Sequence, residues 1–145
     1  MKKFKFSKQN ILNVRAAEKR AAEQNLMNAA GRVRFEEEQL ELIKDKFNSA
    51  RMAKYLPGAG FSDFQQYKVN YTELLKKRLK RQELNLKNAR KDYDVAIEKL
   101  KAAMIEFRKL ENLYENEKIS WTKELLRFEN ILGDEMALRA KYYAR

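Results

Sequence analysis

The sequence predicts an all-α protein, an antiparallel two-helix coiled-coil hairpin with a longer C-terminal helix. Three observations carry this prediction. Apolar residues recur every seven positions, helix-breaking residues gather at one place, and charged residues make up 37% of the chain. A seven-residue repeat with two apolar positions marks a helix whose narrow apolar seam must be covered by another helix. We therefore expect the protein to act through shape and partners and not through chemistry of its own.

The first helix is expected over about residues 7–56. One heptad series in this segment consists of Leu12, Leu26, Val33, Leu40 and Phe47, with Lys19 as its polar exception. The companion series consists of Ala22, Ala29, Ile43 and Ala50, with Glu36 as its exception. The two series together give this helix one apolar seam.

The one clear break in the helical pattern is the segment Leu56-Pro57-Gly58-Ala59-Gly60. Proline disfavours helix at the residue before it, and glycine allows the backbone angles that end a helix. We expect a turn over residues 57–61 and a second helix over about residues 62–142, because Ser62 and Gln65 have capping-box spacing. Residues 1–145 would then form a single hairpin domain.

The second helix carries the strictest repeat in the chain. Its first series consists of Leu79, Leu86, Tyr93, Leu100, Phe107, Tyr114, Trp121 and Phe128. The companion series consists of Ala89, Ala96, Ala103, Leu110, Ile131 and Leu138, interrupted by Gln82, Glu117 and Glu124.

A fold-back centred near Ala59 predicts the register of the two helices. The expected pairs are Leu26 with Tyr93, Val33 with Leu86, Leu40 with Leu79, and Leu12 with Phe107. The same register places the acidic block 36–41 opposite the basic residues of 77–81. Exposed ion pairs contribute only ~0–1 kcal/mol each, so this block would select the alignment while seam burial holds the hairpin together.

Beyond about Tyr114 the second helix has no expected partner within the chain. Its apolar stripe nevertheless continues through Trp121, Leu125, Phe128, Ile131, Leu132 and Leu138. An apolar stripe left in water marks an interaction surface or a segment that frays. Another protein, self-association and local disorder are the alternatives that the pattern leaves open.

Composition excludes several classes of chemistry. The chain has no Cys and no His, which removes disulfides, thiolate nucleophiles, imidazole bases and the usual zinc ligands. It has no phosphate-binding glycine loop, and its carboxylates lie among Lys and Arg at helical spacing, as on solvated helix faces. We therefore expect no enzyme activity, no catalytic, cofactor-binding or metal-binding residue, and no cofactor.

No apolar run approaches the roughly 20 residues that span a bilayer, so we expect no direct membrane insertion. The net charge of +11 is uneven. Residues 68–91 carry nine basic and two acidic residues, and residues 111–135 carry three basic and seven acidic ones. A basic helix could follow phosphates, but no nucleic-acid motif accompanies it. A solvated or partner-facing basic surface is favoured, and a nucleic-acid binder remains an alternative.

Three short segments resemble the flagellar FliJ family of export proteins. The first is the opening segment, residues 4–15, with two Phe, a Gln, an Ile-Leu pair and a later apolar-Arg pair. Lys8 departs from it, since Leu is commoner there. The second is Asp63-Phe64-Gln65-Gln66-Tyr67, and the third is residues 133–139, with an Asp-Glu-x-Ala-x-Arg order. The order and spacing of these segments extend the resemblance over the whole chain.

The resemblance implies a cytoplasmic stalk and adaptor, peripheral at the cytoplasmic face of the inner membrane, in the bacterial flagellar type III export apparatus. Its implied partners are the hexameric export ATPase FliI, the cytoplasmic region of the export gate FlhA, and flagellar export chaperones. The implied contact with the ATPase ring involves Phe4, Phe6, Arg15, Trp121, Leu125, Phe128, Asp134, Glu135 and Arg139.

The implied contact with the export gate falls on Tyr67, Tyr71, Leu74 and Arg78. Their spacing of four, three and four puts them on one helical face, away from the seam. The alternative is that they are ordinary half-exposed surface residues, with Arg78 pairing with the first helix.

Two further functions remain alternatives to this one. A generic coiled-coil scaffold would form a tight homodimer, whereas the hairpin is expected to be monomeric on its own. The equivalent stalk protein of a virulence-type secretion system would share the fold, although the Phe-x-Phe start and the Asp-Glu ending favour the flagellar branch.

Overall fold

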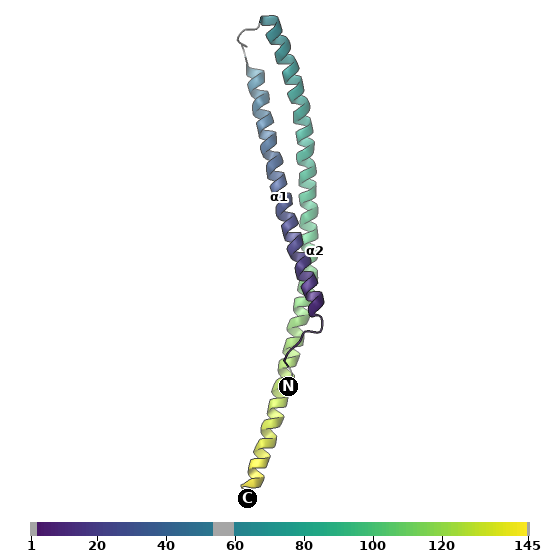
Figure 1. The fold of residues 1–145 in the computed structure, drawn as a ribbon, viewed down its shortest axis with the longest axis vertical. Helices are drawn as coiled ribbons and strands as arrows, with labels where there is room; N and C mark the ends of the chain where they lie inside the picture. Colours follow the sequence, from purple (N-terminus) through teal and green to yellow (C-terminus); the bar gives the residue numbers. More distant parts are fainter. Residues whose placement is uncertain (1–2, 54–59, 145) are drawn as a thin grey trace. The chain divides into compact units, whose positions relative to one another are not determined.

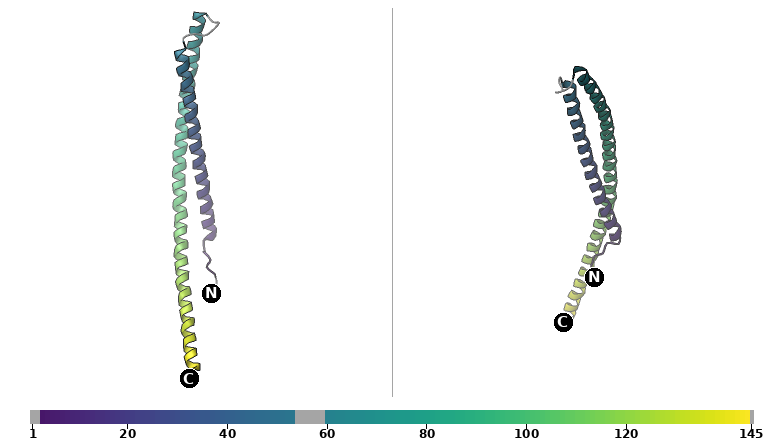
Figure 2. Two further views of the ribbon diagram at one scale, coloured as in Figure 1. Left: turned by 90° about the vertical axis from the view of Figure 1, so that its left-hand side faces the viewer. Right: turned by 45° about the horizontal axis from the view of Figure 1, so that its top comes forward.

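The computed structural model describes residues 3–53 and 60–144. It consists of two α-helices, α1 (Gln9–Met52) and α2 (Phe61–Tyr143), and no strand occurs in the described residues. The helices pack against each other in opposite directions (Figure 1), and two further views show the same course (Figure 2). The predicted all-α hairpin with a longer C-terminal helix is confirmed.

The chain divides into two compact units, which are described separately. Unit 1 consists of Met1–Arg20 and Ala102–Arg145, and unit 2 of Ala21–Lys101. The prediction that the whole chain is one domain stays a prediction.

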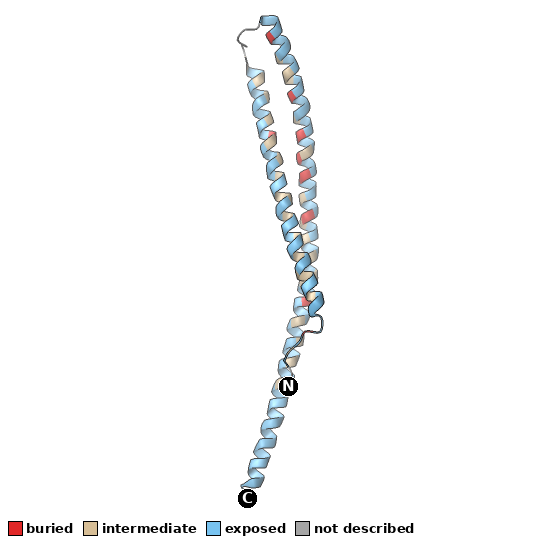
Figure 3. Ribbon diagram, viewed as in Figure 1, coloured by how far each residue is buried: buried red, intermediate tan, exposed pale blue. Residues whose placement is uncertain are grey.

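The seam in unit 2 follows the predicted heptads. Leu40, Leu86, Ala89 and Ala96 are buried. The buried positions of the two helices are red in Figure 3. The remaining predicted seam positions of this unit are half-buried: Ala22, Leu26, Ala29, Val33, Ile43, Phe47, Ala50, Leu79, Tyr93 and Leu100. Phe64 and Leu75 are buried as well, so the seam extends toward the start of α2. The predicted seam is confirmed in this unit.

The polar exceptions of the unit 2 seam pair with each other. The Gln82 side-chain amide donates to the backbone oxygen of Glu36 at 3.0 Å, and also to the Glu36 carboxylate. Gln82 is only 8% exposed, and none of the buried side-chain polar atoms in the described residues lacks a hydrogen-bond partner. The predicted register places Glu36 opposite residue 83, so this pair lies within one position of it.

The charged residues beside the seam do not pair block against block. Glu37 pairs with Arg90 at 3.4 Å, and Glu41 pairs with Lys44 of its own helix at 3.9 Å. Within the described residues, no basic residue of 77–81 forms an ion pair with the acidic block. Long side chains at the edge of a seam reach along the helix axis, so facing blocks need not form the facing pairs.

Helix α2 starts one residue earlier than expected. Its first helical hydrogen bond runs from the Phe64 N–H to the Gly60 carbonyl at 2.9 Å, which makes Gly60 the N-cap. Ser62 therefore lies in the first turn, and the capping box expected at Ser62 is wrong. Glycine is an acceptable N-cap, and the carboxylate of Asp63 in the first turn favours the positive end of the helix dipole.

Helix α1 begins two residues later than expected, and it ends at Met52. At its start, Leu12 donates to the Lys8 carbonyl at 2.9 Å, so residue 7 stays outside the helix. At its end, the Ala53 N–H donates to the Ala50 carbonyl at 3.4 Å. A hydrogen bond to the third residue back is the 3₁₀ type that often ends an α-helix. The expected helix end at 54–56 and the turn at 57–59 lie outside the described residues.

Unit 1 contains its own seam between the start of α1 and the later part of α2. Leu12 and Phe107, an expected pair, line the same small hollow. Leu110 is buried and Ala103 is half-buried. The ammonium group of Lys19, the polar exception in the α1 series, lies 4.9 Å from the ring centroid of Phe107. A cation over an aromatic face is attracted by the ring, so a lysine is tolerated at this seam position.

Candidate partner-binding surfaces

The residues before α1 form a strap on α2. We call residues 3–7 the N-terminal strap. Phe6 is 7% exposed and meets Tyr114 edge to face, with ring centroids 5.4 Å apart. The ring centroid of Phe4 lies 5.4 Å from that of Tyr114 and 5.9 Å from that of Trp121. Residues two apart on an extended chain point to the same side, so both rings of Phe4-Lys5-Phe6 face α2.

Glu117 fixes the end of the strap. The Ser7 hydroxyl donates to Glu117 Oε1 at 2.9 Å, and the Ser7 backbone N–H lies 3.4 Å from Oε2. Glu117 interrupts the apolar heptad series of α2, and this contact gives that interruption a structural role. A carboxylate beside the start of a helix is also favoured by the helix dipole, and α1 begins two residues after Ser7.

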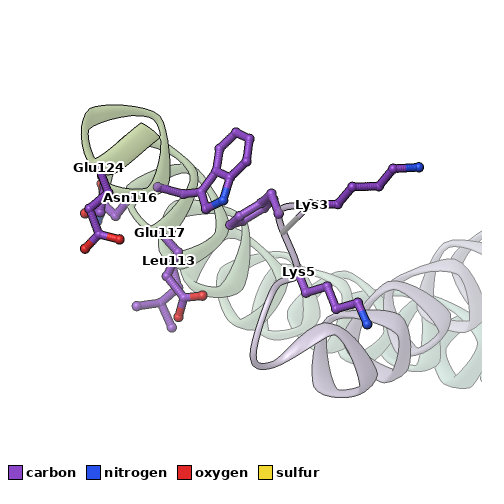
Figure 4. Close-up of a pocket in the computed structure, with 9 residues that line it drawn as sticks. Lys3, Lys5, Leu113, Asn116, Glu117 and Glu124 are labelled. Carbon is purple, nitrogen blue, oxygen red and sulfur yellow. The ribbon is translucent and has the colours of Figure 1, made fainter. Parts of the chain in front are cut away.

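An open hollow of about 1050 Å³ lies beside the strap. Its lining combines Phe4, Leu113 and Trp121 with polar and charged groups. Lys3 and Lys5 come from the strap, and Glu117 and Glu124 come from α2 (Figure 4). The lining therefore takes its basic residues from the strap and its acidic residues from α2.

Arg15, an expected contact with the ATPase ring, lies next to carboxylates of its own chain. It pairs with Glu18 at 2.9 Å, and this hydrogen bond, with a smaller contribution from Glu106, raises the pKa of Arg15. Glu106 pairs in turn with Lys109 at 3.0 Å, and that hydrogen bond lowers the pKa of the Glu106 carboxyl. Arg15 is therefore engaged within unit 1.

The C-terminal part of α2 exposes its apolar side chains. Leu125 is half-buried, and Phe128, Ile131, Leu132 and Leu138 are exposed. Asp134, Glu135 and Arg139, the charged residues of the expected ATPase contact, are exposed too. The expectation that α2 has no partner beyond about Tyr114 is wrong for Glu117 and Trp121, because Ser7 bonds to the first and Phe4 contacts the second. We call Leu125, Phe128, Ile131, Leu132 and Leu138 the C-terminal stripe.

The four residues expected to meet the export gate lie near the start of α2 in unit 2. Tyr67 and Tyr71 stack, with centroids 5.8 Å apart and ring planes at 9°. Tyr67, Leu74 and Arg78 are exposed, and Tyr71 is half-buried. Arg78 forms no ion pair in the described residues, so the alternative pairing with the first helix is not observed.

The side chains on these surfaces can bind a partner through apolar contact and through charge. In the part of the chain that the structure describes, no group of acidic residues is arranged to hold a metal ion. No described helix is long and apolar enough to cross a bilayer.

Comparison with known proteins adds a family to this geometry. The family described as "Flagellar FliJ protein" matches residues 4–144. The chain belongs to the FliJ family. No curated protein and no solved structure matches it significantly. Membership of the FliJ family identifies a flagellar export-associated protein, and the family is a non-enzymatic component of export.

Sequence reasoning missed the strap in this FliJ-family chain. Phe4 and Phe6 are expected contacts of a partner and Tyr114 is a residue of the helix seam, and the structure brings all three rings together within the chain. Ser7 and Glu117 were not considered as a pair. The available signals were the Phe-x-Phe spacing and the position of Glu117 in the companion heptad series, directly after Leu110.

Proposed function

We propose that this chain is a non-enzymatic stalk and adaptor of the bacterial flagellar type III export apparatus. It binds and stimulates the hexameric export ATPase FliI, contacts the cytoplasmic region of FlhA, and escorts flagellar export chaperones. The observation that carries this proposal is the family match over residues 4–144 of a helical hairpin. The proposed location is the cytoplasmic face of the inner membrane, reached through these partners.

The C-terminal stripe supports a contact with the ATPase. Its side chains are apolar and exposed, and fully burying one of them contributes about 1.5–3 kcal/mol. Leu125, Phe128 and Leu132 are spaced by three and four residues and share one side of α2 with Trp121. A helix with an uncovered apolar side is suited to lie in a groove of another protein.

A matched pair of leucines tests this contact. Leu132→Ala removes a residue of the stripe that is 42% exposed, and Leu126→Ala removes one on another side of α2 that is 53% exposed. We expect Leu132→Ala to raise roughly tenfold the concentration of the chain that is needed to stimulate ATP hydrolysis by FliI. A loss of about 1.4 kcal/mol of binding free energy corresponds to this factor. Leu126→Ala should stimulate as the unmodified chain does. Equal effects of both variants would contradict this location of the contact.

The tyrosine pair supports the contact with FlhA. Stacked Tyr67 and Tyr71 with exposed Leu74 form a small amphipathic patch, and tyrosine is enriched where binding energy concentrates. Leu74→Ala should reduce binding to the cytoplasmic region of FlhA in calorimetric titration. Leu84→Ala, an exposed leucine on the same helix, should leave it unchanged. Unaltered binding by the Leu74 variant would favour an ordinary surface role for the patch.

A further inference from the structure

We propose that the N-terminal strap is an autoinhibitory cover that opens and closes over Tyr114 and Trp121. In the closed form it occupies the end of the apolar side of α2 that a partner would take. The partner part of this inference rests on the proposed function, whereas the opening and closing of the strap can be measured without any partner.

The contacts of the strap define what it covers. Phe6 and Phe4 both touch Tyr114, and Phe4 also touches Trp121. Trp121 begins the same side of α2 that Leu125, Phe128 and Leu132 continue. A partner lying along that side therefore meets Phe4 at Trp121, and the two cannot occupy the same ring face together.

Other features make closure reversible. The strap lies outside α1, so no helical ladder holds it. Phe4 stays half-exposed, and the hydrogen bonds from Ser7 to the Glu117 carboxylate at the end of the strap are exposed to water. An open hollow adjoins Phe4 and Trp121, so the Phe4 ring can leave Trp121 into open space, whereas Phe6 must leave its buried contact with Tyr114.

Trp121 reports the state of the strap, because it is the single tryptophan of the chain. Quenching of its fluorescence by acrylamide should increase in the double variant Phe4→Ala/Phe6→Ala, since both covering rings are lost. Leu126→Ala should quench as the unmodified chain does. Unchanged quenching in the double variant would overturn the proposal, because Trp121 would then not be covered.

A covalent link tests the consequence of closure. The chain contains no cysteine, so Ser7→Cys/Glu117→Cys can be joined specifically by a short bis-maleimide. The same variant capped on both cysteines with a monofunctional maleimide carries similar bulk without the link. We expect the linked protein to be less quenchable at Trp121 than the capped one. We also expect it to stimulate FliI with an apparent affinity about tenfold or more weaker, because its open fraction is removed.

Two results would overturn the inference. Equal quenching in the linked and capped proteins would mean that the strap does not open. Equal stimulation of FliI by both would mean that the strap need not open for the partner. If the unmodified chain does not stimulate FliI at all, the proposed function fails instead, and the quenching comparison still decides whether the strap moves.

Discussion

At single positions of the seam, polar side chains are matched by particular partners. Gln82 bonds to Glu36, Lys19 lies over the ring of Phe107, and Glu117 holds Ser7. A polar residue in a coiled-coil seam reduces stability but fixes the alignment of the helices. These residues therefore specify the register more than they stabilise the fold.

Replacing Gln82 with leucine tests this role. An apolar residue fits the seam, and Glu36 is only half-buried and can turn to water. We expect Gln82→Leu to keep or raise Tm in thermal circular dichroism, and to increase self-association in light scattering. Glu36→Gln, which keeps a hydrogen-bonding side chain, should leave both measurements near their original values. A marked loss of Tm in Gln82→Leu would show that the pair is net stabilising.

Glu106 gives a prediction about pH. Its hydrogen bond to Lys109 lowers the pKa of the carboxyl. Because the pKa is lowered in the folded protein, the interaction contributes fully to folding stability at pH values above the ordinary Glu pKa. This contribution is lost as the pH falls through the lowered pKa. We expect the NMR chemical shift of the Glu106 carboxyl carbon to titrate at a lower pH than that of an ordinary Glu. The Lys109→Ala substitution should bring the pKa of Glu106 back toward the ordinary value. A Glu106 resonance that titrates in the ordinary range before any substitution would contradict this.

At the scale of the helices, the seam and the exposed sides differ in what they tolerate. Leu75 is fully buried at 0% exposure, and Leu84 on the same helix is 56% exposed. We expect Leu75→Ala to lower the free energy of unfolding by about 2–3 kcal/mol, the lower part of the range for buried leucines. Leu84→Ala should change it by less than about 0.5 kcal/mol. Urea denaturation followed by circular dichroism measures both, and similar losses would mean that the seam does not hold the helices together.

Gly31 lies inside α1, and a Cβ added there would meet nothing within 4 Å. Glycine within a helix is less favourable than alanine by about 0.5–1 kcal/mol. We therefore expect Gly31→Ala to stabilise the protein by about that amount in the same urea experiment. Destabilisation by this variant would indicate that the position needs glycine for a reason beyond helix propensity.

At the scale of the whole molecule, the net charge of +11 opposes self-association, whereas the exposed C-terminal stripe favours it. We expect a monomer at micromolar concentration in size-exclusion chromatography with light scattering. A tight dimer would favour the coiled-coil scaffold over the adaptor.

The heptad pattern was sufficient to predict the fold and the seam, since a repeating apolar position leaves few alternatives. It could not reveal the pairing of Glu36 with Gln82, because a heptad treats each polar exception separately. It also missed the strap, because Phe4 and Phe6 precede the helical period and their position depends on contacts with Tyr114 and Trp121. The facing of opposite charges predicted the ion pairs less well, because Glu37 pairs with Arg90 and not with a basic residue of 77–81.

The bond between Glu36 and Gln82 has a consequence for how related sequences can diverge. A change at one of these positions removes the hydrogen bond that fixes the register, so the alignment of the two helices, more than their stability, limits how each position can vary. Among relatives that keep this hairpin, substitutions at the two positions should be inherited together, either as another hydrogen-bonding couple or as two apolar residues.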